Sequence, residues 1–395
     1  MTGSKVGAFL KKYTMVIALI AVIIFFYFST DGQILVPQNI SNLISQNGYV
    51  FVLATGMLLC ILTGGNIDLA VGSVVCFAGG CGAIMMDKNI HPLVACIAML
   101  VIGLLIGMWQ GFWIAYVKVP PFIATLAGMF AFRGLSNVVM GGFAISLSEE
   151  HAQQGAFLQV FGGGAKCYIP DFIGSDEKFN LTCMLLGVII AAVYVVITLV
   201  GRIRAKSQGY KVDKLVPTLV KMVVIAALIV WMAWMLAQYK GIPTILLWIA
   251  GILLVYGYIT KKTTFGRNLY AVGGNEKATR LSGIDTRKVF FTAYANMGLL
   301  AGLAGIVNIA RYMSAQPTYG QGYEMDAIAA CFIGGASAYG GIGSVGGVVL
   351  GASLLGIINQ GMSIMGMNAN YQKVVKGIVL LLAILFDVLG KKKKK

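Results

Sequence analysis

The segment Phe265–Asp285 reads FGRNLYAVGGNEKATRLSGID and separates two long apolar runs in a chain whose residues are 58% hydrophobic. A polar segment of this length between membrane-spanning runs must reach water, because lipid leaves charged and backbone polar groups unsatisfied. It carries the signals of a short helix, with Asn275 at the N-cap, Glu276 in the first turn and Gly283 just beyond the end. We therefore expect a short helix outside the membrane, over about Asn275–Gly283.

This short helix has two interpretations. Ala278 and Leu281 are three residues apart and share one helix face, which suits docking into the groove of a soluble partner. An ordinary solvated connector would carry the same start and stop signals. The residues assigned to docking under the first interpretation are Asn275, Glu276, Lys277, Ala278, Arg280, Leu281 and Gly283.

The composition is that of a polytopic membrane protein. Only 11% of the residues are charged, against about 25% in soluble domains. The formal net charge of +16 comes from basic residues that flank apolar runs, so it indicates membrane orientation and not nucleic-acid binding. The chain has no G-x-x-x-x-G-K-[ST] loop and no H-E-x-x-H or other metal-ligand spacing. We therefore expect no enzyme activity, cofactor or metal site, and ATP hydrolysis would need a separate partner.

Twelve apolar runs have about the length that a membrane-spanning helix needs, near 20 residues. They predict an all-α polytopic membrane protein with about 10–12 transmembrane helices, several of them short or broken. We expect a single transmembrane domain over residues 1–395. The runs cover roughly residues 13–29, 48–63, 68–86, 92–117, 121–140, 181–200, 217–238, 244–260, 289–310, 325–339, 344–362 and 372–390.

Basic residues predict the orientation. Lysine and arginine gather in loops 201–221 and 261–288 and at both termini, and an even number of spans places all of these on one side. The positive-inside rule makes that side cytoplasmic, so 261–288 is a cytoplasmic loop. Loop 141–180 then forms an extracytoplasmic loop or cap. It holds five acidic residues against two lysines: Glu149, Glu150, Asp171, Asp176 and Glu177, with Lys166 and Lys178.

Two glycine-rich breaks indicate a two-fold internal repeat. Thr63–Ser73 reads TGGNIDLAVGS, and Ile333–Ser344 reads IGGASAYGGIGS. Both follow a run that travels inward, and an outward run follows each. Paired broken helices point to a transport pathway, although small residues also serve plain helix packing.

Asp68 lies far from any water-facing loop, so its carboxylate must either have a partner within the protein or contact water in a cavity. It is either a residue of the pathway or, like Asn66, a cap for the helix that follows. Phe122 opens the next span after the Pro120-Pro121 turn. The residues assigned to the substrate pathway are Asn66, Asp68, Phe122, Gly334, Gly335 and Ser337.

Several further charges lie in or near apolar runs. Arg133 is inside a span, and the sequence names no partner for it. Asp326 opens an inward run, where negative charge suits the helix dipole better than it suits a substrate role. Lys376 falls near the outer end of the last span, where it either snorkels to the surface or faces the interior.

Four segments resemble the permease subunits of bacterial ABC importers for monosaccharides, the group with ribose, xylose and galactose permeases. They are Gly64–Ser73 (GGNIDLAVGS), Val119–Gly134 (VPPFIATLAGMFAFRG), Gly266–Ile284 and Gly322–Gly347. The third is most similar to the xylose and multiple-monosaccharide branch. Glu276, Ala278 and Gly283 loosely resemble the importer E-A-A…G motif. Lys277 stands where that motif has an alanine, and the glycine spacing differs by about one.

The resemblance implies a bacterial inner-membrane permease subunit without cofactors of its own. It implies a cytoplasmic ABC ATPase that docks on a coupling helix in 266–284, and a periplasmic or lipoprotein sugar-binding protein outside. It also implies a second permease subunit, commonly a homodimer, surrounded by membrane lipid. The main alternative is an ion-coupled secondary sugar transporter that uses Asp68, and another is a membrane scaffold without transport.

Overall fold

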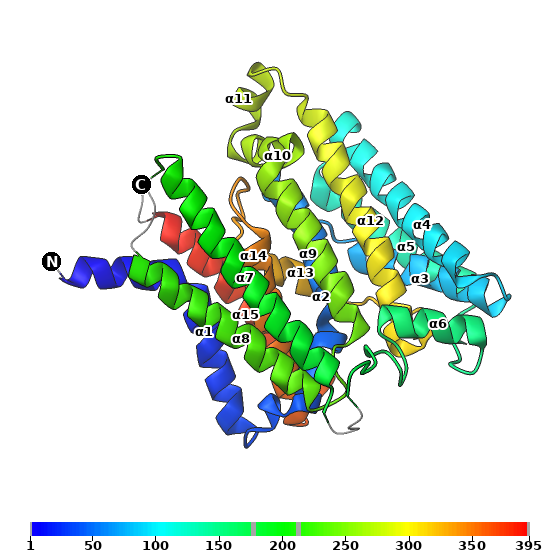
Figure 1. Ribbon diagram of the computed structural model, residues 1–395. Coiled ribbons are helices and arrows are strands. Elements are labelled where there is room, and N and C mark those ends of the chain that lie inside the picture. The colour runs from blue at the N-terminus through cyan, green and yellow to red at the C-terminus, as the bar shows by residue number, and fades with distance from the viewer. Residues whose placement is uncertain (1, 175–178, 211–214, 393–395) are drawn as a thin grey trace. The chain divides into compact units, whose positions relative to one another are not determined.

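The computed structural model describes residues 2–174, 179–210 and 215–392 and is almost wholly helical (Figure 1). Two short strands, β1 (Ile145–Ser146) and β2 (Ser314–Ala315), pair antiparallel. A 3₁₀ turn, η1, covers Gln33–Leu35, and a π-helical turn, η2, covers Trp113–Val117. The α-helices are α1 (Thr2–Ser29), α2 (Pro37–Leu62), α3 (Val71–Asp87), α4 (Pro92–Phe112), α5 (Pro121–Met140), α6 (Ala152–Phe161), α7 (Leu181–Ser207), α8 (Leu215–Ala237), α9 (Thr244–Lys262), α10 (Thr264–Gly274), α11 (Glu276–Leu281), α12 (Thr286–Tyr312), α13 (Tyr323–Ile333), α14 (Val345–Ile364) and α15 (Ala369–Lys392).

The predicted all-α polytopic fold is confirmed. Within the described residues, eight helices are long and apolar enough to cross a membrane: α2, α4 with η2, α5, α7, α8, α9, α12 and α14. Shorter apolar helices cover Thr14–Ser29 and α3. Each of the twelve expected runs overlaps a helix. The run expected at 325–339 contains only the 11-residue α13, about 17 Å long, which is too short to cross a hydrocarbon core of about 30 Å.

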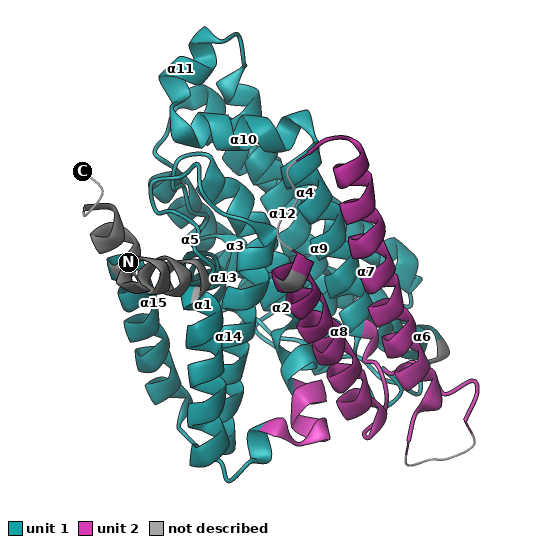
Figure 2. Cartoon of the chain, turned by 60° about the vertical axis from the view of Figure 1, so that its left-hand side comes forward, with its two compact units in different colours: residues 1–34, 43–167, 245–395 teal, residues 35–42, 168–244 magenta. Residues whose placement is uncertain are grey.

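The chain groups into two compact units (Figure 2). Unit 1 contains Met1–Ile34, Leu43–Cys167 and Ile245–Lys395, and unit 2 contains Leu35–Asn42 and Tyr168–Thr244. The single permease domain over 1–395 stays a prediction, as do the sides of the membrane assigned to its loops. Some charges used for that assignment lie outside the described residues: Asp176, Glu177, Lys178, Lys211, Lys214 and Lys393–Lys395.

The core of unit 1 is built around α12, which packs against α3 and α4. A glycine pair on α4, Gly103 and Gly107, faces a pair on α12, Gly298 and Gly302. A Cβ atom on Gly103 would overlap the carbonyl oxygen of Gly298, so the two backbones approach as closely as helices can. Such small-x-x-x-small pairs are the usual means of tight helix packing in membranes.

Unit 2 contains the hairpin of α7 and α8, the loop that precedes it and the short segment Leu35–Asn42 (Figure 2). The carboxylate of Asp171 in that loop accepts hydrogen bonds from the hydroxyl of Thr182 at 2.6 Å and from the backbone N–H groups of Gly174 and Leu181 at 3.0 and 2.7 Å. The bond from Thr182, followed by the backbone N–H groups, holds the pKa of Asp171 well below its usual range. Asp171 therefore fixes the loop to the start of α7.

Candidate functional site

The two glycine-rich breaks cross each other inside unit 1. The backbone N–H of Gly341 donates to the carbonyl oxygen of Leu62 at 3.1 Å. Gly65 has a φ of +76°, and a Cβ atom there would overlap the carbonyl oxygen of Ala338. Only glycine combines this left-handed backbone with so close an approach. The helix–break–helix arrangement therefore occurs twice, in α2–α3 and in α13–α14, and the two breaks touch.

The first break is held by its own polar side chains. Asp68 is buried, and its Oδ1 accepts from the backbone N–H of Ala70 at 2.8 Å, just before α3 begins. Asn66 donates to the hydroxyl of Thr63 at 3.1 Å. The hydrogen bond from Ala70 supports the interpretation of Asp68 as a cap at the start of α3. The side chain of Asn66 instead contacts Thr63, directly after the end of α2.

The second break is a tight loop closed by backbone hydrogen bonds. The buried Ser337 donates its N–H to the carbonyl oxygen of Ile342 at 2.8 Å and accepts from the N–H of Gly340 at 3.0 Å. Ser344 then caps α14 by accepting from the N–H of Gly347 at 3.0 Å. These hydrogen bonds therefore fix the backbone conformation of the loop between α13 and α14.

The short helix predicted in the polar loop is present as α11. Asn275 ends α10 and opens α11, where its side chain accepts from the N–H of Ala278 at 3.0 Å. Gly283 follows the helix with a φ of +84°. Ala278 is exposed, and the side chain of Leu281 is 89% exposed. The helix signals are confirmed as local structure, and docking of a partner on this helix stays a prediction.

Helix α10 links α11 to the crossing of the breaks. The hydroxyl of Tyr270 donates to the carbonyl oxygen of Gly343 at 2.9 Å. Leu269 and Val272 are buried on the same helix. Helix α10, which precedes α11, is therefore bound to the second break by one hydrogen bond, and one of its faces is buried. The sequence assigned no role to Tyr270. The only indication was that an aromatic residue stands in a polar loop.

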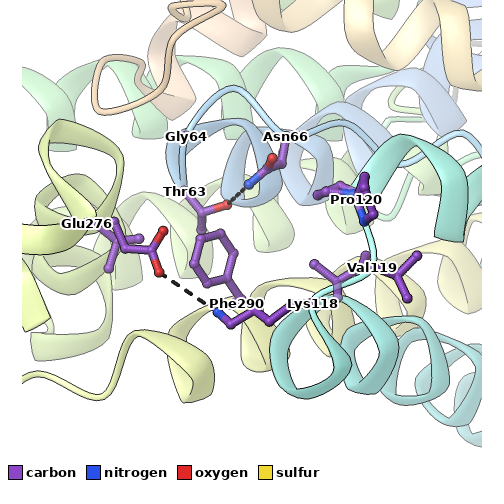
Figure 3. Close-up of a pocket in the computed structure, with 11 residues that line it drawn as sticks. Thr63, Gly64, Asn66, Lys118, Val119, Pro120, Glu276 and Phe290 are labelled. Carbon is purple, nitrogen blue, oxygen red and sulfur yellow. Dashed lines mark hydrogen bonds and ion pairs between the residues drawn. The ribbon is translucent and has the colours of Figure 1, made fainter.

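A cleft of about 310 Å³ lies between the first break, α10–α11 and the turn between η2 and α5 (Figure 3). Lys118 and Glu276 face each other across it, with Nζ and Oε1 3.9 Å apart. Both side chains are about half exposed, so the pair contributes about 0–1 kcal/mol to stability. The lining residues are Thr63, Gly64, Asn66, Ile114, Lys118, Val119, Pro120, Pro121, Val272, Glu276 and Phe290.

Only one residue from each of the two predicted sets of site residues lines the cleft. Asn66 from the pathway set and Glu276 from the docking set both line it. Asp68 is buried away from this lining, and Phe122 is exposed on the first turn of α5. Gly334, Gly335 and Ser337 belong to the second break and are likewise absent from the lining.

Lys118 is a residue of the cleft to which the sequence analysis assigned no role. Its backbone is left-handed, with a φ of +69°, which ends the π-helical turn η2 and precedes the two prolines. Its Nζ lies 5.6 Å from the ring centroid of Phe290. The Pro120-Pro121 pair marked a turn here, but only the fold shows that this turn faces Glu276.

The structure supplies a partner for Arg133. Its Nη1 donates to the carbonyl oxygen of Tyr319 at 2.6 Å and to that of Pro317 at 3.4 Å. A cation in an apolar helix is thus satisfied by backbone dipoles. No group of three or more histidine, cysteine or acidic side chains within the described residues could hold a metal ion.

Comparison with known proteins agrees with this architecture. Residues 39–384 match the family model described as "Branched-chain amino acid transport system / permease component". The xylose transport system permease protein XylH of Escherichia coli (strain K12) is 36% identical over 385 residues, covering 97% of this chain and 93% of the relative. The XylH protein of Haemophilus influenzae is 38% identical, covering 97% and 98%.

A third relative is the ribose import permease protein RbsC of Escherichia coli (strain K12), which is 33% identical over 381 residues and covers 96% of this chain and 94% of its own length. No solved structure gives a significant match. The chain therefore belongs to the family of branched-chain amino acid transport system permease components, and it is a multi-pass membrane permease of an ABC importer and not an enzyme.

Proposed function

We propose that the chain is the transmembrane permease subunit of an ATP-driven importer and forms the pathway for a monosaccharide of the xylose, glucose or galactose type. The observation that carries this proposal is the identity of 36–38% with xylose permeases along nearly the whole of both chains. The family description names branched-chain amino acids. The curated relatives described above are sugar permeases, and we give that specific likeness more weight than the broad description.

The partners follow from the class of transporter. A cytoplasmic ABC ATPase docks on α11, and an extracytoplasmic sugar-binding protein delivers substrate at the opposite face. A second copy of this chain completes the pathway as a homodimer. The exposed Leu281 next to the basic Lys277 and Arg280 supports the docking site, because it combines an apolar anchor with surrounding charge. The protein is placed in the bacterial inner membrane with both termini cytoplasmic.

The coupling route runs from α11 through α10 to the breaks. Asn275 ends α10 and caps α11, so a single residue joins the two helices. Tyr270 joins α10 to Gly343, and Gly341 joins the second break to Leu62. A push on α11 therefore reaches both broken helices, whose rearrangement changes access to the pathway. Gly334, Gly335, Ser337, Asn66 and Phe122 would flank that pathway.

The ion-coupled alternative depends on Asp68 as a proton or sodium site. It has less support, because Asp68 already accepts a hydrogen bond at the start of α3 and the chain aligns end to end with permeases of transport systems. It predicts uptake by this chain alone, driven by an ion gradient.

The substrate class is tested with the assembled transporter. ATP hydrolysis by the complex of permease and ATPase is measured with the sugar-binding protein loaded with D-xylose, D-ribose or D-galactose. Stimulation by at least one sugar supports the proposal. A parallel assay uses a leucine-binding receptor loaded with leucine. Stimulation by that receptor alone would contradict the sugar assignment while keeping the permease assignment.

A further inference from the structure

A second cavity, of about 470 Å³, lies in unit 1 at the far end of α2 from the crossing of the breaks. It is lined by Tyr49 of α2, which is 13 residues before Leu62 and therefore about 20 Å away along the helix. Gln46 and Asn47 also come from α2, and the remaining lining residues come from the C-terminal ends of α12 and α14 and from the first turns of α15. In the predicted orientation this end of the bundle faces the sugar-binding protein.

The lining carries four carboxamide side chains: Gln46, Asn47, Asn359 and Gln372. The Oδ1 of Asn359 is buried and has no hydrogen-bond partner among the described residues. A buried acceptor left in this way is costly, and Asn359 is also one of the residues that line the cavity. Carboxamides each offer a donor and an acceptor, which complements hydroxyl groups that both donate and accept.

One of the two cations at this cavity is compensated within the protein. Lys376 lines it, and its Nζ lies 2.9 Å from Oδ1 and 3.1 Å from Oδ2 of the buried Asp326. The hydroxyl of Tyr49 donates to the same carboxylate at 2.8 Å. Arg311 is the other charged residue of the lining. An anionic ligand would compete with Asp326 for Lys376, whereas a neutral polyhydroxyl ligand would leave the pair in place.

Aromatic rings complete the lining. Tyr49 stacks on Tyr323 with ring centroids 3.8 Å apart, and the hydroxyl of Tyr323 accepts from Asn308 at 2.6 Å. Tyr312 is exposed and also lines the cavity. Rigid tyrosines present an apolar face beside a polar tip, as the face of a sugar ring requires. The cavity volume lies within the range of about 300–1,000 Å³ that is usual for small-molecule sites.

We infer that this cavity is a low-affinity binding site for a neutral monosaccharide, held by Asn359, Gln372 and Gln46 beside the Asp326–Lys376 pair. The inference rests on the proposed function, and it adds a binding site for the sugar that is remote from the cleft at α11. The Asp326–Lys376 pair positions α15 against α13 and thereby keeps the amides in place.

The test is saturation-transfer difference NMR on the full chain in lipid nanodiscs, with D-xylose and D-ribose as probes. The unsubstituted chain should transfer saturation to at least one of the two sugars. Asn359→Leu and Gln372→Met keep side-chain volume while removing hydrogen bonds, so each should weaken binding about fivefold. Asn370→Leu, an exposed residue of α15 outside the lining, is the matched control and should bind as the unsubstituted chain does.

Three results would overturn the inference. The first is the absence of transfer to either sugar, and the second is equal transfer in all four proteins. The third is loss of transfer when phosphatidylglycerol is added to phosphatidylcholine nanodiscs, which would make the cavity a lipid-headgroup site. None of these alters ATP hydrolysis stimulated by a sugar-loaded receptor, so failure here is separate from failure of the proposed function.

Discussion

The backbone N–H of Gly341 donates to the carbonyl oxygen of Leu62 at 3.1 Å, which ties the last residue of α2 to the loop between α13 and α14. Leu62 is the final helical residue, so its carbonyl has no partner within α2. The bond therefore satisfies a helix end and fixes the two breaks together. The proposed coupling route depends on this crossing.

We predict that Gly65→Ala destabilises the protein by about 2 kcal/mol or more. A left-handed backbone costs a residue with a Cβ about 1–2 kcal/mol, and this Cβ would also overlap Ala338. Thermal unfolding in detergent, followed by tryptophan fluorescence, measures the effect. Gly346→Ala is the control, because a Cβ there meets no heavy atom within 4 Å. Equal unfolding temperatures for the two variants would contradict the crossing.

We predict that Leu281→Asp uncouples the permease from its ATPase without unfolding it. The side chain is 89% exposed, so little packing within this chain is lost, while an acidic group replaces the apolar anchor of the docking face. Co-purification of the ATPase should fall at least tenfold, with an unchanged unfolding temperature. Lys262→Ala makes the same change in net charge at an exposed site of α9 and should retain the ATPase. Normal co-purification with Leu281→Asp would remove α11 from the docking role.

We predict that the Asp326–Lys376 pair behaves as a buried ion pair. Asp326→Asn should cost about 3 kcal/mol, because Lys376 then stays partly buried without its carboxylate. The double variant Asp326→Asn/Lys376→Met should be more stable than Asp326→Asn alone. Lys373→Met, at an exposed position of the same helix, should change stability by less than about 0.5 kcal/mol. Unfolding in detergent compares these variants with the unsubstituted chain, and a double variant no more stable than Asp326→Asn alone would argue against the pair.

We predict that Asp171 makes loop 168–180 sensitive to acid. Its folded pKa lies below the unfolded value of about 3.9. The stabilisation is therefore complete at neutral pH and is lost as the pH falls below about 4 towards the folded pKa. Limited proteolysis of the loop should be slow from pH 7 to 5 in the native protein and faster in Asp171→Asn. The difference between the two should shrink below pH 4, and a difference that stays constant would exclude this role of the carboxylate.

Much of the fold follows from the sequence, because the length of an apolar run and the caps at its ends act locally. The twelve expected runs all overlap helices, and Asn275 and Gly283 bound α11 as their residue types indicate. The position of the breaks was also readable, since glycine pairs in apolar runs are local signals.

The contacts that build the site could not be read in the same way. Lys118 and Glu276 are far apart in the chain and meet only because η2 and α11 pack near the first break. The sequence left two interpretations of Lys376 open, and the structure shows that this lysine pairs with Asp326 of α13. Nothing in the sequence around Tyr270 indicated a bond to Gly343. These are tertiary contacts, and periodicity and capping carry no information about them.

The most direct test of the account is uptake of radiolabelled D-xylose, D-ribose and D-galactose into proteoliposomes that contain this chain. The vesicles are prepared with and without the ABC ATPase, the sugar-binding protein and ATP, and with and without a proton or sodium gradient. We predict that at least one sugar accumulates only when the ATPase, the binding protein and ATP are all present. Accumulation by the permease alone, driven by an ion gradient, would contradict the account.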